Sequence, residues 1–289
     1  RRAGGGPTLT GRMDSPRLTD AQRYVRQTAF DGLGPAGQAA LAAGSALIVG
    51  TGGLGSWTAE LLARAGVRRL RLVDDDAVDP TNLHRQAMYD ESDAAAATPK
   101  ALAAARHLAR IASGVAVEPV VARLDAGNVD RLADGMEVVL DGTDNFATRF
   151  LLNDWCILHG RPWVFAGVVR AEGQVMTIIP GRTPCLRCIY ESPPPPEEEV
   201  TARTAGVLGP AVATIAAIQA AEALKLLAGR AERANPRLLR LDLWTNVCRA
   251  VEAARELGML TVGLTGGAGG RLAGLAEQVL SISCTDSTP

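Results

Sequence analysis

The stretch ALIVGTGGLGSW, residues 46–57, decides the fold. Four apolar residues lead into a glycine-rich run, and a mostly apolar segment follows. The glycines of the run are Gly50, Gly52, Gly53 and Gly55. Between a strand and a helix, the pattern G-x-G-x-x-G lets the backbone approach a phosphate group, which the free N–H groups of the helix N-terminus attract. We therefore predict a nucleotide-binding turn; the alternative is a tight strand–helix connection that binds no ligand.

Strand and helix patterns alternate along most of the chain. Strands are expected at residues 46–50, 68–76, 115–123, 136–145, 162–170, 173–179 and 237–244, and helices at 20–43, 54–65, 99–113, 146–159 and 208–228. This alternation predicts an α/β fold with a Rossmann-like, doubly wound, mostly parallel sheet. Two consecutive strands after residue 162 predict that the sheet continues as a mixed or antiparallel part.

Composition narrows the class of protein. The 289 residues are 47% hydrophobic and 21% charged, with a net charge of −1, which indicates neither a nucleic-acid nor a membrane-surface partner. The apolar stretch 207–229 contains Pro210, Gln219, Glu222 and Lys225, so we expect a buried helix rather than a membrane span. Five cysteines and no secretory signal favour a reducing, cytoplasmic setting. Residues 1–19, basic and rich in glycine and proline at their start, are expected to form a disordered leader.

Charged residues follow the ends of two predicted strands. Asp74 or Asp76 stands where an acid would bind ribose hydroxyls, which suits NAD as well as ATP. Arg85 and Lys100 come next, and Asp144 follows a later strand. Because the carboxyl ends of parallel strands share one crevice, two cations and a carboxylate there suit a triphosphate and Mg²⁺.

Each of these residues also has a simpler interpretation. Arg85 and Lys100 taken singly could be surface charges, and Asp141 could cap the helix that begins at residue 146. The ordered set favours function over these alternatives.

At this point the chain resembles the ThiF/MoeB/HesA family, the prokaryotic relatives of ubiquitin-activating enzymes. The resemblance runs to about Trp244 through RYVRQ (23–27), GTGGLGS (50–56), LVDDDAVDPTNLHRQ (72–86), PKALAA (99–104), LDGTDNFATRFLLND (140–154), GVVRAEGQVM (167–176), PCLRCIYESPPPP (184–196) and TAGVLGPAVATIAAIQAAEALKLLAG (204–229). It implies a homodimer that uses ATP and Mg²⁺ to adenylate the C-terminal glycine carboxylate of a small ubiquitin-like sulfur carrier ending in Gly-Gly, as in molybdopterin or thiamine biosynthesis.

The resemblance also implies roles. Asp74 matches the ribose-binding acid, with Asp76 assisting, and Asp144 would hold Mg²⁺. Lys100 would hold the phosphates. Arg26 matches an arginine that reaches into the ATP site of the partner subunit. The nucleotide would further contact the four glycines of the turn together with Asn82, Arg85 and Gln86, with Arg85 on the outer phosphates.

The chain departs from the family pattern at two places. Zinc-binding members have two C-x-x-C pairs, whereas here Cys185 and Cys188 form the only one. Because structural zinc takes four ligands, both zinc and a pair of free loop thiols stay open. Some relatives carry a sulfur-transfer cysteine where this chain has Ala202, so we predict adenylation without a covalent protein thioester.

The tail follows a different pattern. We expect residues 20–245 to form the adenylation domain, and residues 246–289 resemble a C-terminal fragment of a sugar isomerase (SIS) domain, the phosphoheptose isomerase type. Its pattern predicts a partial β–α–β unit with helices at 247–257 and 271–277 and strands at 259–264 and 279–283. The alternatives to an adenylating enzyme are therefore a degenerate carrier-binding module, an NAD-dependent Rossmann enzyme, and sugar-phosphate isomerisation by the tail.

Overall fold

The computed structural model describes residues 19–195, 200–250, 262–266 and 278–282. Its strands are β1 (Ser45–Val49), β2 (Arg69–Val73), β3 (Ala116–Val120), β4 (Val138–Asp141), β5 (Trp163–Val169), β6 (Glu172–Ile178), β7 (Leu239–Asp242), β8 (Val247–Ala250), β9 (Val262–Gly266) and β10 (Gln278–Ile282). Its α-helices are α1 (Asp20–Arg23), α2 (Val25–Thr28), α3 (Gly34–Leu41), α4 (Gly53–Ala65), α5 (Glu91–Ala95), α6 (Lys100–Ile111), α7 (Val129–Ala133), α8 (Phe146–Leu158), α9 (Ala202–Ala205) and α10 (Gly209–Leu227). Short 3-10 turns occupy Pro80–Asn82, Leu186–Cys188 and Ala231–Arg233.

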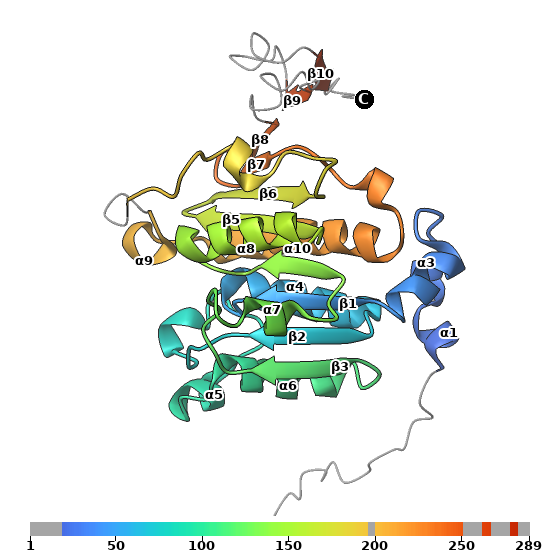
Figure 1. Cartoon of the computed structure of the whole chain (residues 1–289), viewed down its shortest axis with the longest axis vertical. Coiled ribbons are helices and arrows are strands. Elements are labelled where there is room, and N and C mark those ends of the chain that lie inside the picture. Colours follow the sequence, from blue (N-terminus) through green and yellow to red (C-terminus); the bar gives the residue numbers. More distant parts are fainter. Residues whose placement is uncertain (1–18, 196–199, 251–261, 267–277, 283–289) are drawn as a thin grey trace, which may run out of the picture.

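One eight-stranded sheet organises the chain, in the order β3-β2-β1-β4-β5-β6-β7-β8 (Figure 1). The first five strands in that order run parallel, and each later neighbour pairs antiparallel. The predicted α/β fold and its antiparallel continuation are therefore confirmed. The chain leaves β1 on one side toward β2 and β3 and returns on the other side as β4, so the strand order switches between β1 and β4. Open α/β sheets bind ligands at such a point.

Helices cover both faces of this sheet. Alternate residues of β1 point to opposite faces: Ala46 and Ile48 join a core formed with α4, α6 and α10, whereas Leu47 and Val49 join a second core formed with α7 and α8. All five residues of β1 are buried, as expected for a central strand of a parallel sheet. The resulting three layers expose the carboxyl ends of the parallel strands at one end of the sheet.

Helix α10 belongs to the core. Among the described residues it is the one helix long and apolar enough to cross a membrane, judged by length and composition alone. It packs against α4, β5 and β6, and its buried Gln219 donates to the carbonyl oxygens of Asp141 and Val164 at 2.8 and 2.9 Å. The predicted buried helix is present, and its polar side chain is satisfied inside the protein.

Several boundaries differ from the prediction. The helix expected over residues 20–43 is divided into α1, α2 and α3. Tyr24 separates α1 from α2, and a turn that leads into Gly34, with φ +63°, precedes α3. The helix expected from residue 247 is wrong at its start: residues 247–250 form β8, which pairs with the otherwise open edge of β7. Tertiary pairing here overrides the helical pattern.

Further along, β9 and β10 pair in parallel as a separate two-stranded sheet. They correspond to the two strands expected in the tail. The predicted leader up to residue 18 and the predicted helix at 271–277 lie outside the described residues, and the SIS-like domain assignment stays a prediction.

Candidate functional site

A cleft of about 1620 Å³ opens where the carboxyl ends of the parallel strands meet. Its lining includes the glycine turn after β1, the acidic segment after β2, the turn after β4 and residues of the β5–β6 hairpin. It extends beyond these to the segment 192–195 and α9. Pockets for single small ligands usually measure about 300–1,000 Å³, so this cleft has room for a nucleotide and part of a second molecule.

The glycine turn needs its glycines for close backbone contacts. Gly50 has φ +82°, and a Cβ on Gly55 would lie 1.8 Å from the carbonyl oxygen of Gly50. Helix α4 then begins after Gly52 without any side-chain cap. Its first N–H groups lack a capping acceptor, and the positive end of the 13-residue helix faces the cleft.

A buried hydrogen-bond network of Asp74 and Tyr89 fixes this turn at Thr51. The Asp74 Oδ2 atom accepts hydrogen bonds from Thr51 N (2.6 Å) and Thr51 Oγ1 (3.0 Å), and Oδ1 accepts from Asp76 N (2.9 Å). The Tyr89 hydroxyl donates to the Thr51 carbonyl at 2.7 Å. Burial raises the pKa of Asp74, while the Lys100 charge and these hydrogen bonds oppose that shift. Tyr89 lies outside the glycine motif, and sequence analysis missed it.

The two acids predicted to bind ribose differ in their exposure. Asp74 is 8% exposed and both of its oxygens are used to fix the turn. Asp76 has a side chain that is 68% exposed, and its carboxylate accepts from the Lys100 ammonium at 2.7 Å. Both acids line the cleft: Asp74 also anchors the glycine turn, and Asp76 has the more exposed carboxylate.

The segment after the acids brings further polar groups to the cleft. Arg85 Nη2 donates to Asn82 Oδ1 at 2.6 Å and Nη1 donates to the Thr81 carbonyl at 3.2 Å. Burial lowers the pKa of the Arg85 guanidinium, and the Asp144 charge opposes this shift. Gln86 is 3% exposed and has its amide beside Gly52, and within the described chain its Oε1 has no hydrogen-bond partner. Such a buried unpaired group is uncommon and suits contact with a ligand.

The turn after β4 is also held by a buried acid. Asp141 is fully buried and accepts from Thr143 N (2.9 Å) and Arg149 Nε (3.2 Å). It does not cap α8; that role belongs to Asn145, whose side chain accepts from Thr148 N at 2.9 Å. Asp144 lies between these anchors and is exposed in the cleft.

Arg149 is a residue that sequence analysis missed. It is 8% exposed, lies between the rings of Phe146 and Phe165 at 5.2 and 5.4 Å, and donates from Nη2 to the Thr143 carbonyl at 2.8 Å. Together with its bond to Asp141, this contact fixes the turn that carries Asp144. An arginine beside Phe150 in an otherwise apolar part of α8 is the signal that could have revealed it.

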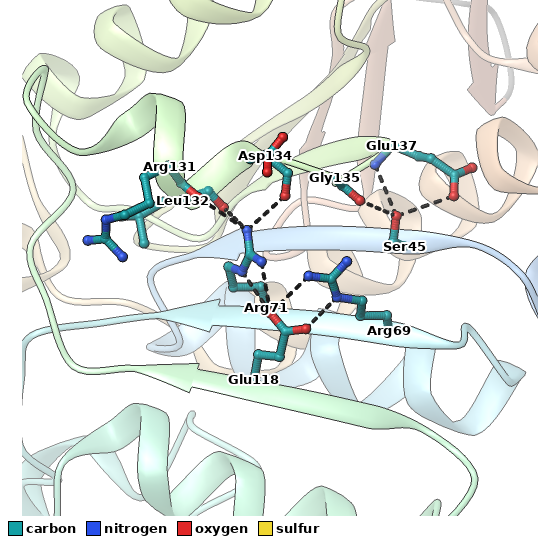
Figure 2. A network of polar contacts seen from close by, with 9 residues as sticks. All are labelled: Ser45, Arg69, Arg71, Glu118, Arg131, Leu132, Asp134, Gly135 and Glu137. Atoms are coloured by element: carbon teal, nitrogen blue, oxygen red, sulfur yellow. Dashed lines mark hydrogen bonds and ion pairs between the residues drawn. The ribbon is translucent and has the colours of Figure 1, made fainter.

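A second network, around Arg71, resembles that of Arg149 but lies outside the cleft. Figure 2 shows Arg71 on β2, which pairs with Glu118 at 2.9 Å and donates to the carbonyl oxygens of Leu132 (2.6 Å) and Asp134 (3.0 Å). Arg69 also pairs with Glu118. None of these residues lines the cleft, so the network ties β2 and β3 to the end of α7.

Two predicted site elements lie away from these groups. Arg26 is an exposed residue of α2, and helices α1 and α3 lie at the opposite end of the sheet from α5 and α9 (Figure 1). The Cys185 and Cys188 sulfurs are 3.9 Å apart. Among the described residues, no third His, Cys, Asp or Glu groups with them, so these residues do not fit a four-ligand zinc site.

Comparisons with known proteins agree on one family. The ThiF family matches residues 24–258. The sulfur carrier protein ThiS adenylyltransferase of Bacillus subtilis is 40% identical over 232 residues, which cover 80% of this chain and 68% of that protein. The SAMP-activating enzyme E1 of Haloferax volcanii is 42% identical over 224 residues, covering 78% of this chain and 82% of that protein.

Longer relatives and solved structures extend the comparison. The adenylyltransferase and sulfurtransferase MOCS3 of Sus scrofa is 41% identical over 81% of this chain, and the chain spans only 51% of its length. The crystal structure of E. coli MccB with ATP superposes with a TM-score of 0.69 at 20% identity, covering 81% of this chain and 72% of that one. At this identity the likeness concerns the fold alone.

We expect Asp74→Asn to lower the free energy of unfolding by about 1–3 kcal/mol, because an amide NH₂ would replace one of two oxygens that accept from backbone N–H groups. Asp75→Asn, at an exposed neighbouring position, serves as the matched control and should change it by less than about 0.5 kcal/mol. Urea unfolding measures both. Equal effects of the two substitutions would show that Asp74 does not anchor the glycine turn.

Proposed function

The chain belongs to the ThiF family, and we propose that it is an ATP-dependent adenylyltransferase that activates the C-terminal glycine carboxylate of a small ubiquitin-like sulfur-carrier protein. One observation carries the proposal: Arg85, Lys100, Asp76 and Asp144 line a single cleft beside the uncapped N-terminus of α4. The related proteins named for sulfur-carrier adenylylation and SAMP activation support the same reaction class. ATP as cosubstrate also fits a cytoplasmic location.

Different residues of the chain would bind different parts of the nucleotide. The α4 N-terminus and the glycine turn receive phosphate oxygens, and Asp74, assisted by Asp76, accepts hydrogen bonds from ribose hydroxyls. Lys100, released from Asp76, and Arg85 neutralise the phosphates. Asp144 offers an exposed carboxylate to Mg²⁺, whose preferred ligands are oxygens, and when bound this cation would neutralise charge on the triphosphate.

The reaction is a displacement at phosphorus. An oxygen of the carrier's terminal carboxylate forms a bond to the α-phosphorus, and the bond from that phosphorus to the bridging oxygen of the β-phosphate breaks. Pyrophosphate leaves with that oxygen. A carboxylate is a weak nucleophile, so positioning and charge neutralisation supply the rate enhancement. No proton needs to be removed, so this step requires no general base.

We propose that two copies complete each site. Arg26 does not line the cleft of its own chain, and its neighbours Val25 and Phe30 expose 58% and 68% of their surface. Exposed apolar side chains around a cation suit an interface with a second copy, through which Arg26 would reach the partner's nucleotide.

The first test is carrier-dependent exchange of labelled pyrophosphate into ATP, with ubiquitin-like proteins that end in Gly-Gly. We expect exchange with the cognate carrier, reduced at least about 100-fold in Asp144→Ala, because the variant lacks the carboxylate that would hold Mg²⁺ against the phosphates. Carrier binding without exchange would indicate the degenerate binding module instead. Exchange that is absent while NAD binds would favour the Rossmann redox alternative.

Arg149→Lys tests whether Arg149 positions the turn that carries Asp144 for catalysis or only stabilises the fold. Lysine keeps the charge but cannot reach Asp141 and the Thr143 carbonyl together, so we expect kcat to fall at least about tenfold and half-saturation to need more Mg²⁺. Arg71→Lys is the control: it removes a guanidinium that likewise binds a carboxylate and backbone carbonyl oxygens, but away from the cleft. This variant should lower Tm without changing kcat. If the two variants lose Tm alike and both keep kcat, Arg149 has only a structural role.

Mixing experiments test the shared site. Arg26→Ala and Asp144→Ala should each be inactive, but refolded mixtures should regain about a quarter of wild-type exchange, because half of the dimers are mixed and each has one intact site. Activity that stays at the level of the separate variants would contradict a role for Arg26 in the partner subunit. Each variant refolded alone is the control.

A further inference from the structure

The turn that carries Cys185 and Cys188 presents two neighbouring thiols. It is a 3-10 turn over Leu186–Cys188 in which Cys188 N donates to the Cys185 carbonyl at 3.0 Å. The sulfur atoms are 3.9 Å apart, Cys188 is exposed and Cys185 is partly exposed. Modest side-chain rotation would bring them to bonding distance, because a C-x-x-C turn is short enough to close a disulfide.

Residues of helix α8 contact this turn at two positions. The side chain of the buried Asn153 accepts from Leu186 N at 2.8 Å, and Leu186 itself is fully buried. Arg187 donates to both carboxylate oxygens of Asp154, at 2.8 and 2.6 Å, and its guanidinium lies 4.9 Å from the ring centre of Phe150. A bidentate pair, a buried leucine and a satisfied backbone N–H therefore fix the turn through contacts within the protein.

We infer that Cys185 and Cys188 form a redox-active dithiol that exchanges with disulfides of small thiols. The Cys188 thiolate attacks one sulfur of the incoming disulfide, forming a mixed disulfide and releasing one thiolate, which takes up a proton. The Cys185 thiolate then attacks the Cys188 sulfur, closing the Cys185–Cys188 bond and releasing the second thiol. The protein dithiol loses two electrons and two protons, and the small disulfide is reduced to two thiols.

Exposure sets the order of attack. Cys188 is the more accessible sulfur, so it meets the incoming disulfide, and Cys185 resolves the intermediate from the same turn. Cys156 is the internal contrast: it is fully buried, and burial raises the pKa of its thiol to about 12, so it should stay unmodified.

The experiment uses the full chain, treated with oxidised glutathione at pH 8, quenched in acid and mapped by peptide mass spectrometry. The wild type should lose two hydrogens in the peptide that contains residues 185–188. Cys185→Ser should retain one glutathione on Cys188. Cys188→Ser should leave Cys185 unmodified over the same time, because the exposed nucleophile is missing.

Metal analysis of the untreated protein completes the test. Less than about 0.2 zinc per chain with both thiols reactive is the expected result. One zinc per chain, with thiols that react only after chelation, would overturn the inference. A disulfide from either cysteine to Cys248 or Cys284 would overturn it as well. Should a serine variant unfold, the mapped wild-type bond still decides, because it requires no substitution.

Discussion

Contact between the turns that follow β1 and β4 is the constraint on which the cleft depends. A Cβ on Gly50 would lie 2.6 Å from the Gly142 carbonyl oxygen, and one on Gly142 would lie 2.1 Å from the Gly50 carbonyl oxygen. Only glycine at both positions allows the two strand ends to meet this closely. At the point where the strand order switches, the two turns therefore form one continuous surface of the cleft. The acids that follow β2 and β4 line this same cleft.

Buried and exposed acids have different tasks around that surface. Asp74 and Asp141 are buried, have hydrogen bonds on both oxygens and fix the turns. Asp76 and Asp144 are exposed and face the cleft. A buried carboxylate is costly unless it is fully paired, whereas an exposed one can exchange partners with a ligand. Rigid turns that carry free charges are what a reaction driven by positioning and charge neutralisation requires.

The sheet and several residues that line the cleft could be predicted from the sequence, because both leave local patterns. Apolar runs between turn residues located β1 to β7, and the glycine motif located the start of α4. Sequence analysis failed where a distant partner decides. Residues 247–250 form a strand because β7 offers an open edge, and Tyr89 and Arg149 matter because folding brings them to Thr51 and Thr143. Likewise, the roles of Asp74 and Asp76 depend on which of the two is buried. The sequence, in which one residue separates them, does not reveal this.

The sequence by itself determined the fold class, the family and the residue types available for ATP chemistry, since strand periodicity, glycine spacing and ordered motifs are local properties. Tertiary structure alone decided which acids are buried anchors and which residue caps the start of α8. It also decided that the C-x-x-C turn is held by α8, through Asn153 and Asp154. These outcomes depend on burial and on pairing between residues far apart in the chain, and both exist only once the layers have packed.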